Sequence, residues 1–100
     1  MHREIKQADG VTQVSFKGVW TMDEFEANKS MLEQLERSGA KVVEYDLSGV
    51  PAVDSAGIGM LILANDRLGK ANVEFRISGV QGAVAQIFDV AKIRDLITVV

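Results

Sequence analysis

The sequence contains no cysteine and only one histidine, His2, in 100 residues. Without cysteine the chain forms no disulfide, offers no thiolate ligand to a metal and has no cysteine nucleophile. A Ser-His-Asp site or a histidine metal site would depend on that single terminal histidine. The G-x-x-x-x-G-K-[ST] phosphate loop and the G-x-S-x-G motif are also missing. We therefore expect a protein that is not an enzyme and that carries no cofactor.

Long apolar runs and an excess of positive charge are missing too. No run reaches the roughly 18 apolar residues of a membrane span, and the first ten residues lack the apolar core of a secretory signal. Fourteen acidic and eleven basic residues give a formal net charge of −3 without a basic stripe, which argues against nucleic-acid binding. We expect one cytoplasmic domain over residues 1–100, with no nucleic-acid partner and no membrane insertion.

The first half of the chain predicts a hairpin followed by a helix. Val11–Lys17 alternates apolar and polar residues as a strand does, and Arg3–Gln7 can pair with it through an Asp9-Gly10 turn. In the helix predicted over 21–39, Thr21 and Glu24 have the spacing of a capping box. Asn28 lies on its apolar face, where we expect a rim residue or a satisfied polar group. The other residues of that face are Phe25, Leu32 and Leu35, with Met22 and Met31 nearby.

The second half alternates strands and helices. β-Branched and aromatic residues favour strands over 41–47 and 72–77. Helical spacing predicts a helix that ends near Leu68, with Gly69 as its stop, and another over 80–88. The tail fits either a short helix over 91–96 or a strand over 96–100. This order predicts an α/β fold: a small mixed, mostly parallel sheet of about four strands, entered by an N-terminal hairpin, with three to four helices packed on it.

The segment "PAVDSAGIGML", from Pro51 to Leu61, is the turn in which ligands and partners commonly dock on such sheets. Asp54 and Ser55 are both favoured helix caps, and capping alone would explain them. Gly57 and Gly59, however, each weaken a helix. We interpret the two glycines as room for another backbone, a partner or a modifying enzyme.

The apolar residues of the following helix add to this interpretation. One stripe consists of Ile58, Leu61, Ile62 and Leu68. Met60 and Leu63 point away from that stripe, which predicts either a second packed side or an exposed contact surface. For Met60, a second core contact is the competing interpretation.

The stretch "VVEYDLSGVPAVDSAGIGMLILANDRL" resembles the characteristic segment of STAS domains, a family named for sulphate transporters and anti-sigma factor antagonists. Asp46, Leu47 and Ser48 match its Asp-Leu-Ser strand end, and Asp54, Ser55 and Gly57 match its Asp-Ser-Ser-Gly helix start. The resemblance implies a non-enzymatic module that binds an anti-sigma factor which is also a serine kinase, and that is switched off when this kinase phosphorylates a serine at the helix start.

One residue departs from the family pattern. The family's phosphorylated serine corresponds to Ala56, and Ser55 matches the serine that is usually not the acceptor. Three interpretations stay open: Ser55 takes the phosphate, another hydroxyl does, or the protein binds its partner without this control. The candidate site residues are Asp54, Ser55, Ala56, Gly57, Gly59, Met60 and Leu63.

The segment "GVWTMDEFEANKSMLEQL" is similar to STAS subunits of phospholipid-transport ABC systems, in which a G-x-W-T segment precedes the first helix. This resemblance implies an alternative function, an adaptor that binds the ATPase subunit of the transporter. Trp20 is the residue in question. It suits an interface, and it equally suits a position that closes one end of the core.

Overall fold

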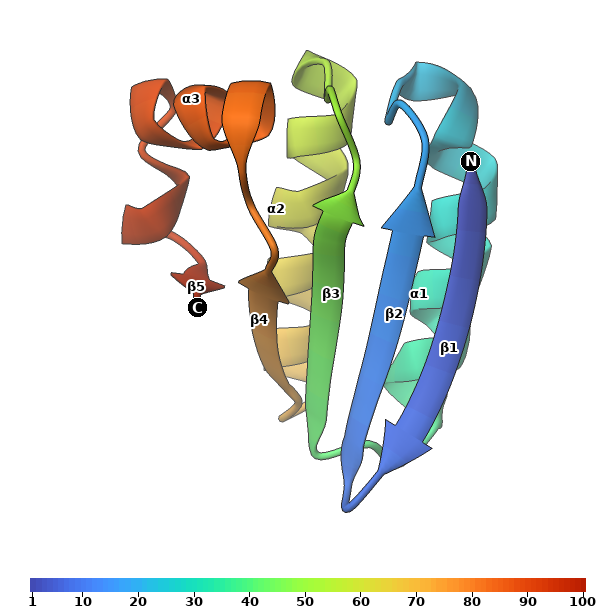
Figure 1. Ribbon diagram of the computed structural model, residues 1–100. Helices are drawn as coiled ribbons and strands as arrows, with labels where there is room; N and C mark the ends of the chain where they lie inside the picture. Colours follow the sequence, from blue (N-terminus) through green and yellow to red (C-terminus); the bar gives the residue numbers. More distant parts are fainter.

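The computed structural model describes residues 1–100, and five strands form one sheet in chain order. Strand β1 (His2–Ala8) runs antiparallel to β2 (Val11–Lys17). Strands β3 (Val42–Gly49), β4 (Glu74–Ser78) and β5 (Thr98–Val99) continue the sheet in parallel (Figure 1). The mixed, mostly parallel sheet and its N-terminal hairpin are thereby confirmed, with five strands where about four were expected.

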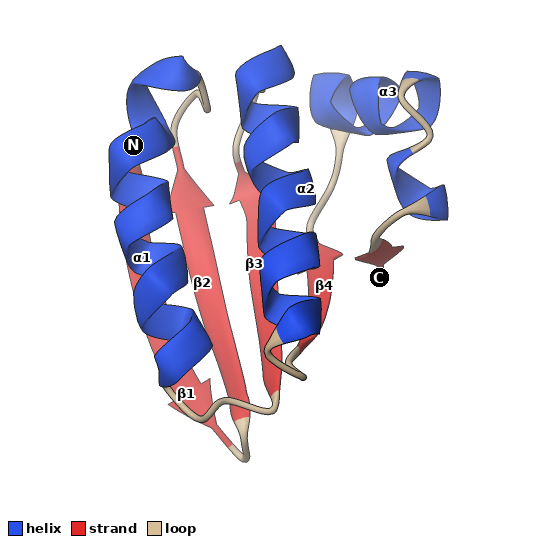
Figure 2. Ribbon diagram, turned by 180° about the vertical axis from the view of Figure 1, so that it is seen from behind, coloured by secondary structure: helices blue, strands red, loops and turns tan.

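Two long helices cover one face of this sheet. A 3-10 turn, η1 (Met22–Glu24), leads into α1 (Phe25–Arg37), and α2 (Ser55–Lys70) lies beside α1 (Figure 2). Helix α3 (Gly82–Val90) follows the carboxyl end of β4, and a second 3-10 turn, η2 (Ile93–Asp95), leads to β5. The sequence left the tail open between a short helix and a strand, and the tail contains a short 3-10 helix followed by a strand.

The core lies between the sheet and helices α1 and α2, because alternate strand residues face the helices. Val43, Tyr45 and Leu47 of β3 are at most 2% exposed. The helices contribute Leu32, Leu35, Leu61 and Leu68 from the other side. In the strand predicted over 72–77, the alternate apolar residues Phe75 and Ile77 are both buried.

The structure differs from the local sequence signals at two places, the carboxyl end of α2 and the start of η1. Helix α2 continues past Gly69 to Lys70, and the left-handed residue that follows is Asn72, with φ of 61°; asparagine tolerates this conformation. At the start of η1, the Thr21 hydroxyl accepts from the backbone N–H of Asp23. The Glu24 carboxylate does not complete a capping box, because the Arg3 guanidinium binds it at 2.7 Å.

Candidate functional site

The turn between β3 and α2 is joined to the segment before η1 by hydrogen bonds. Asp54 caps α2: its Oδ1 accepts from the backbone N–H of Gly57 at 2.8 Å, and its Oδ2 accepts from that of Met22 at 3.3 Å. The backbone N–H of Asp54 donates to the carbonyl of Trp20, and the backbone N–H of Trp20 donates to the carbonyl of Ala52. The cap therefore belongs to Asp54, and it holds the starts of both helices at one end of the sheet.

The two glycines of this turn have different environments. A Cβ on Gly57 would lie 2.3 Å from Val53 Cγ2 and 3.1 Å from the Trp20 carbonyl oxygen. Gly57 is buried, so of the three neighbours that the sequence allowed, it is another backbone that comes close, the Trp20 carbonyl of the chain itself. Gly59 is exposed and a Cβ there would meet nothing within 4 Å.

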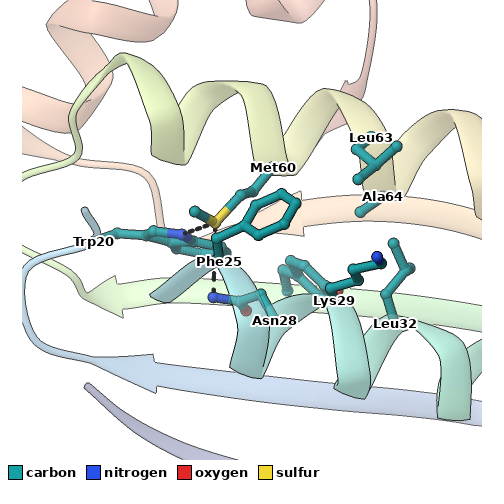
Figure 3. A pocket seen from close by; sticks show the side chains of 9 residues that line it. Trp20, Phe25, Asn28, Lys29, Leu32, Met60, Leu63 and Ala64 are labelled. Atoms are coloured by element: carbon teal, nitrogen blue, oxygen red, sulfur yellow. Dashed lines mark hydrogen bonds between the residues drawn. The ribbon is translucent and has the colours of Figure 1, made fainter. Parts of the chain in front are cut away.

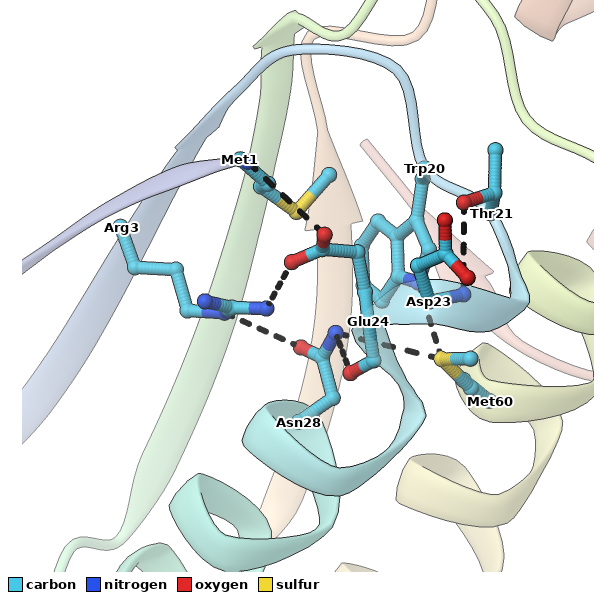
Figure 4. A network of polar contacts seen from close by, with 8 residues as sticks. All are labelled: Met1, Arg3, Trp20, Thr21, Asp23, Glu24, Asn28 and Met60. Atoms are coloured by element: carbon cyan, nitrogen blue, oxygen red, sulfur yellow. Dashed lines mark hydrogen bonds and ion pairs between the residues drawn. The ribbon is translucent and has the colours of Figure 1, made fainter.

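Trp20 closes one end of the core. Its side chain is 1% exposed and its ring stacks near Phe16, with centroids 4.7 Å apart. Its indole N–H donates to the Met60 sulfur at 3.0 Å (Figure 4). The indole is consequently unavailable to a partner, and the core interpretation of Trp20 is the one that the structure supports.

Met60 and Asn28 meet beneath the surface between α1 and α2. Met60 is 7% exposed, so the second core contact is confirmed for this residue and the exposed contact surface is not. Its sulfur accepts the hydrogen bond of the Trp20 indole. The Asn28 amide donates to the Glu24 carbonyl at 2.9 Å and lies 3.9 Å from the Met60 sulfur. Arg3 donates to the Asn28 side-chain oxygen at 3.5 Å. Asn28 is thus the satisfied polar group that its position predicted.

An apolar groove lies between the N-terminal parts of α1 and α2, beside the Asp54 turn. Three of its residues, Phe25, Met60 and Leu63, also line the adjoining pocket drawn in Figure 3. Met22 and Phe25 on its α1 side are 69% and 40% exposed. The sequence pattern placed both near the core face, but Trp20 fills that end of the core and leaves them at the surface. We call this hollow the α1–α2 groove; it is lined by Met22, Phe25, Ala56, Gly59, Met60 and Leu63.

The predicted site residues divide by their position around this groove. Ala56 and Leu63 are half-buried in its wall. Ser55, the first residue of α2, is exposed and makes no side-chain hydrogen bond. Ile62 was predicted in the buried stripe, yet it is 39% exposed; Ala64, a smaller residue, is buried in the stripe.

Sequence reasoning missed the contribution of Met22 and Phe25 to this surface. Their helical spacing relative to Leu32 indicated a core face, and nothing local distinguishes an exposed first turn from a buried one. Their place in the groove depends on the hydrogen bonds that hold η1 against the α2 cap.

The structure contains neither a metal-binding cluster of side chains nor a helix suited to crossing a membrane. No group of three or more His, Asp or Glu residues is arranged to hold a metal ion. Burial in the core raises the pKa of the Tyr45 phenol, which keeps this hydroxyl neutral. No helix combines the length and the hydrophobicity that crossing a bilayer requires. What the site offers chemically is an apolar surface beside an exposed helix start.

Comparisons with known proteins place this geometry in a family. A search of curated proteins found no match. A solved anti-sigma factor antagonist from Mycobacterium paratuberculosis is 20% identical, with a TM-score of 0.86, and the match covers 98% of this chain and 83% of that one. The Bacillus cell fate determinant SpoIIAA in its phosphorylated form is 10% identical, with a TM-score of 0.74 and coverages of 99% and 91%.

A third structure, a sulfate transporter family protein from Wolinella succinogenes, is 22% identical, with a TM-score of 0.75 and coverages of 87% and 71%. At such identities these structures share the fold with this chain. The family model of the STAS domain matches residues 2–100. The chain therefore belongs to the STAS family.

Proposed function

We propose that this protein is a non-enzymatic, cytoplasmic binding module of the anti-sigma factor antagonist type. Its partner is an anti-sigma factor that is also a serine kinase, and binding releases the sigma factor in a partner-switching pathway. The observation that carries this proposal is the α1–α2 groove beside the Asp54–Ser55 turn. Support also comes from the antagonists among the structures of the same fold.

The chemistry of the groove indicates what the partner presents. The side chains of Met22 and Phe25 are exposed and apolar, and methionine and aromatic residues are enriched at protein interfaces. Met22 is in addition conformationally adaptable. Exposed carboxylates at Asp23 and Asp54 flank Met22. An apolar segment with basic flanking residues would be complementary to both features.

Titration calorimetry with anti-sigma serine kinases from the same organism tests this proposal. We expect binding, and we expect Phe25→Ser to weaken it by roughly tenfold or more, as for an interface anchor. Ile62→Ser is the matched control: Ile62 is 39% exposed where Phe25 is 40%, but it lies outside the groove. The proposal fails if no such kinase binds at micromolar concentration, or if the two variants weaken binding equally.

A second candidate function is an adaptor subunit of a phospholipid-transport ABC system that binds the ATPase subunit. The observation in its favour is the G-V-W-T segment, which leads directly to Met22 in the groove. Trp20 itself is buried, so this segment would act by placing η1. Co-purification with an ATPase subunit would support the adaptor, and a gene neighbourhood without transport components would count strongly against it.

A further inference from the structure

Strand β1 forms one edge of the sheet and has a single neighbour, β2 (Figure 1). Half of the backbone N–H and C=O groups of such a strand point away from the sheet. Nearly every residue of β1 is exposed, and Ile5 at its centre is 48% exposed. The edge is therefore seven residues long, accessible, and open to pairing with another strand.

The register of β1 on β2 fixes which face of the sheet each residue occupies. Ile5 lies opposite Val14, whose side chain is fully buried, so Ile5 lies on the helix-covered side. Glu4 and Lys6 lie opposite Ser15 and Gln13, on the other face. The strand thus carries opposite charges on either side of its central isoleucine.

The side chains of β1 are complementary to those of a second β1 strand that runs in the opposite direction beside it. If two β1 strands pair antiparallel about Ile5, then Ile5 meets Ile5 of the second copy, and Glu4 meets its Lys6. By symmetry the same ion pair forms twice, as in any isologous interface. Directly opposed charges of opposite sign stabilise a strand pair, and like charges destabilise it.

We infer that β1 is the dimerisation edge of this protein, at which a second copy of the chain adds its own β1 to make one sheet of ten strands. Lysine on an edge strand ordinarily discourages pairing. Here Lys6 would instead meet Glu4 of the second copy, so the two charges favour antiparallel pairing with the same strand. No residue of the α1–α2 groove lies in β1, so the inference is independent of the proposed function.

A charge-reversal cycle tests the inference by sedimentation equilibrium. Glu4→Lys and Lys6→Glu each create two like-charge contacts across the dimer, and each is expected to weaken dimerisation by roughly tenfold or more. The double variant Glu4→Lys with Lys6→Glu restores both ion pairs and should restore dimerisation. Lys17→Glu is the control, because it makes the same charge change on the neighbouring strand β2.

Amide hydrogen exchange on the unmodified protein gives a second test that needs no variant. The β1 amides that point away from β2 should exchange several times more slowly in concentrated than in dilute solution, while amides elsewhere are unchanged. A protein that stays monomeric at its solubility limit would overturn the inference. So would a dimer that both single reversals leave intact, since it would use another surface.

Discussion

At the scale of single residues, Gly57 and Gly59 offer a matched pair two positions apart in one helix. An alanine methyl at 57 would overlap Val53 and press on the Trp20 carbonyl, and such overpacking costs about 1–3 kcal/mol. At 59 the methyl meets nothing, and removing a helical glycine gains roughly 0.5–1 kcal/mol. Urea denaturation should therefore show Gly57→Ala destabilised and Gly59→Ala stabilised. Equal midpoints for the two variants would contradict this account.

The same pair shows what the sequence could not specify. Two glycines near a helix start indicate that something comes close, but the sequence does not say whether this is a partner or the chain itself. Gly57 faces Trp20, which is 37 positions away and reaches it only because β2 and β3 lie side by side. The sequence left Met60 open between core and surface for the same reason, since the hydrogen bond that settles its position comes from Trp20, 40 positions away.

At the scale of elements, Glu44 joins three strands on the polar face of the sheet. Its carboxylate accepts from Gln13 of β2 and from Arg76 and Ser78 of β4. Burial alone would raise the pKa of Glu44, but these hydrogen bonds, with the Arg76 charge, outweigh burial and lower it below the ordinary 4.5. Because the pKa of Glu44 is lower in the folded protein, the stabilisation from its ionised carboxylate is fully present above pH 4.5. It is lost as the pH falls through the pKa that Glu44 has in the folded protein.

We predict that Glu44→Gln destabilises the protein at pH 7 by roughly 1.5–3 kcal/mol, the range for hydrogen bonds to a charged group. The difference from the unmodified protein should shrink as the pH falls below about 4.5, because both chains then carry a neutral group. Denaturant titrations at several pH values measure this. Glu74→Gln, at an exposed position of β4 without side-chain hydrogen bonds, should show little change at any pH. A pH-independent difference for Glu44→Gln would refute the prediction.

The elements themselves were largely predictable, because alternation and helical spacing are local properties of the sequence. The hairpin, two further strands and the helices were placed from such patterns, while the tail was left open between a helix and a strand. Element ends were less predictable where distant groups compete for a local signal. Glu24 has the spacing of a capping box, yet Arg3 of β1 takes its carboxylate. The weak β5 strand forms because β4 offers it an edge.

At the scale of the whole molecule, the α1–α2 groove exists only once the fold has brought two helix starts together. The α2 side was predictable, since a strand-to-helix turn at the carboxyl edge of a parallel sheet is a common docking place. The α1 side was not, because Met22 and Phe25 follow the pattern of a core face. The place of Ala56 also depends on this assembly, because Ala56 forms part of the wall of the α1–α2 groove.

A phosphate at position 56 would place a dianion against Phe25 and Leu63 and near the Asp54 carboxylate, which opposes docking by desolvation and repulsion. We predict that Ala56→Glu weakens kinase binding by roughly 10- to 100-fold, while Ser55→Glu, at the exposed position outside the groove wall, has a smaller effect. With kinase and ATP, intact-mass analysis should show one added phosphate on Ala56→Ser and none on the unmodified chain. Prompt stoichiometric phosphorylation of the unmodified chain, abolished by Ser55→Ala, would instead make Ser55 the switch.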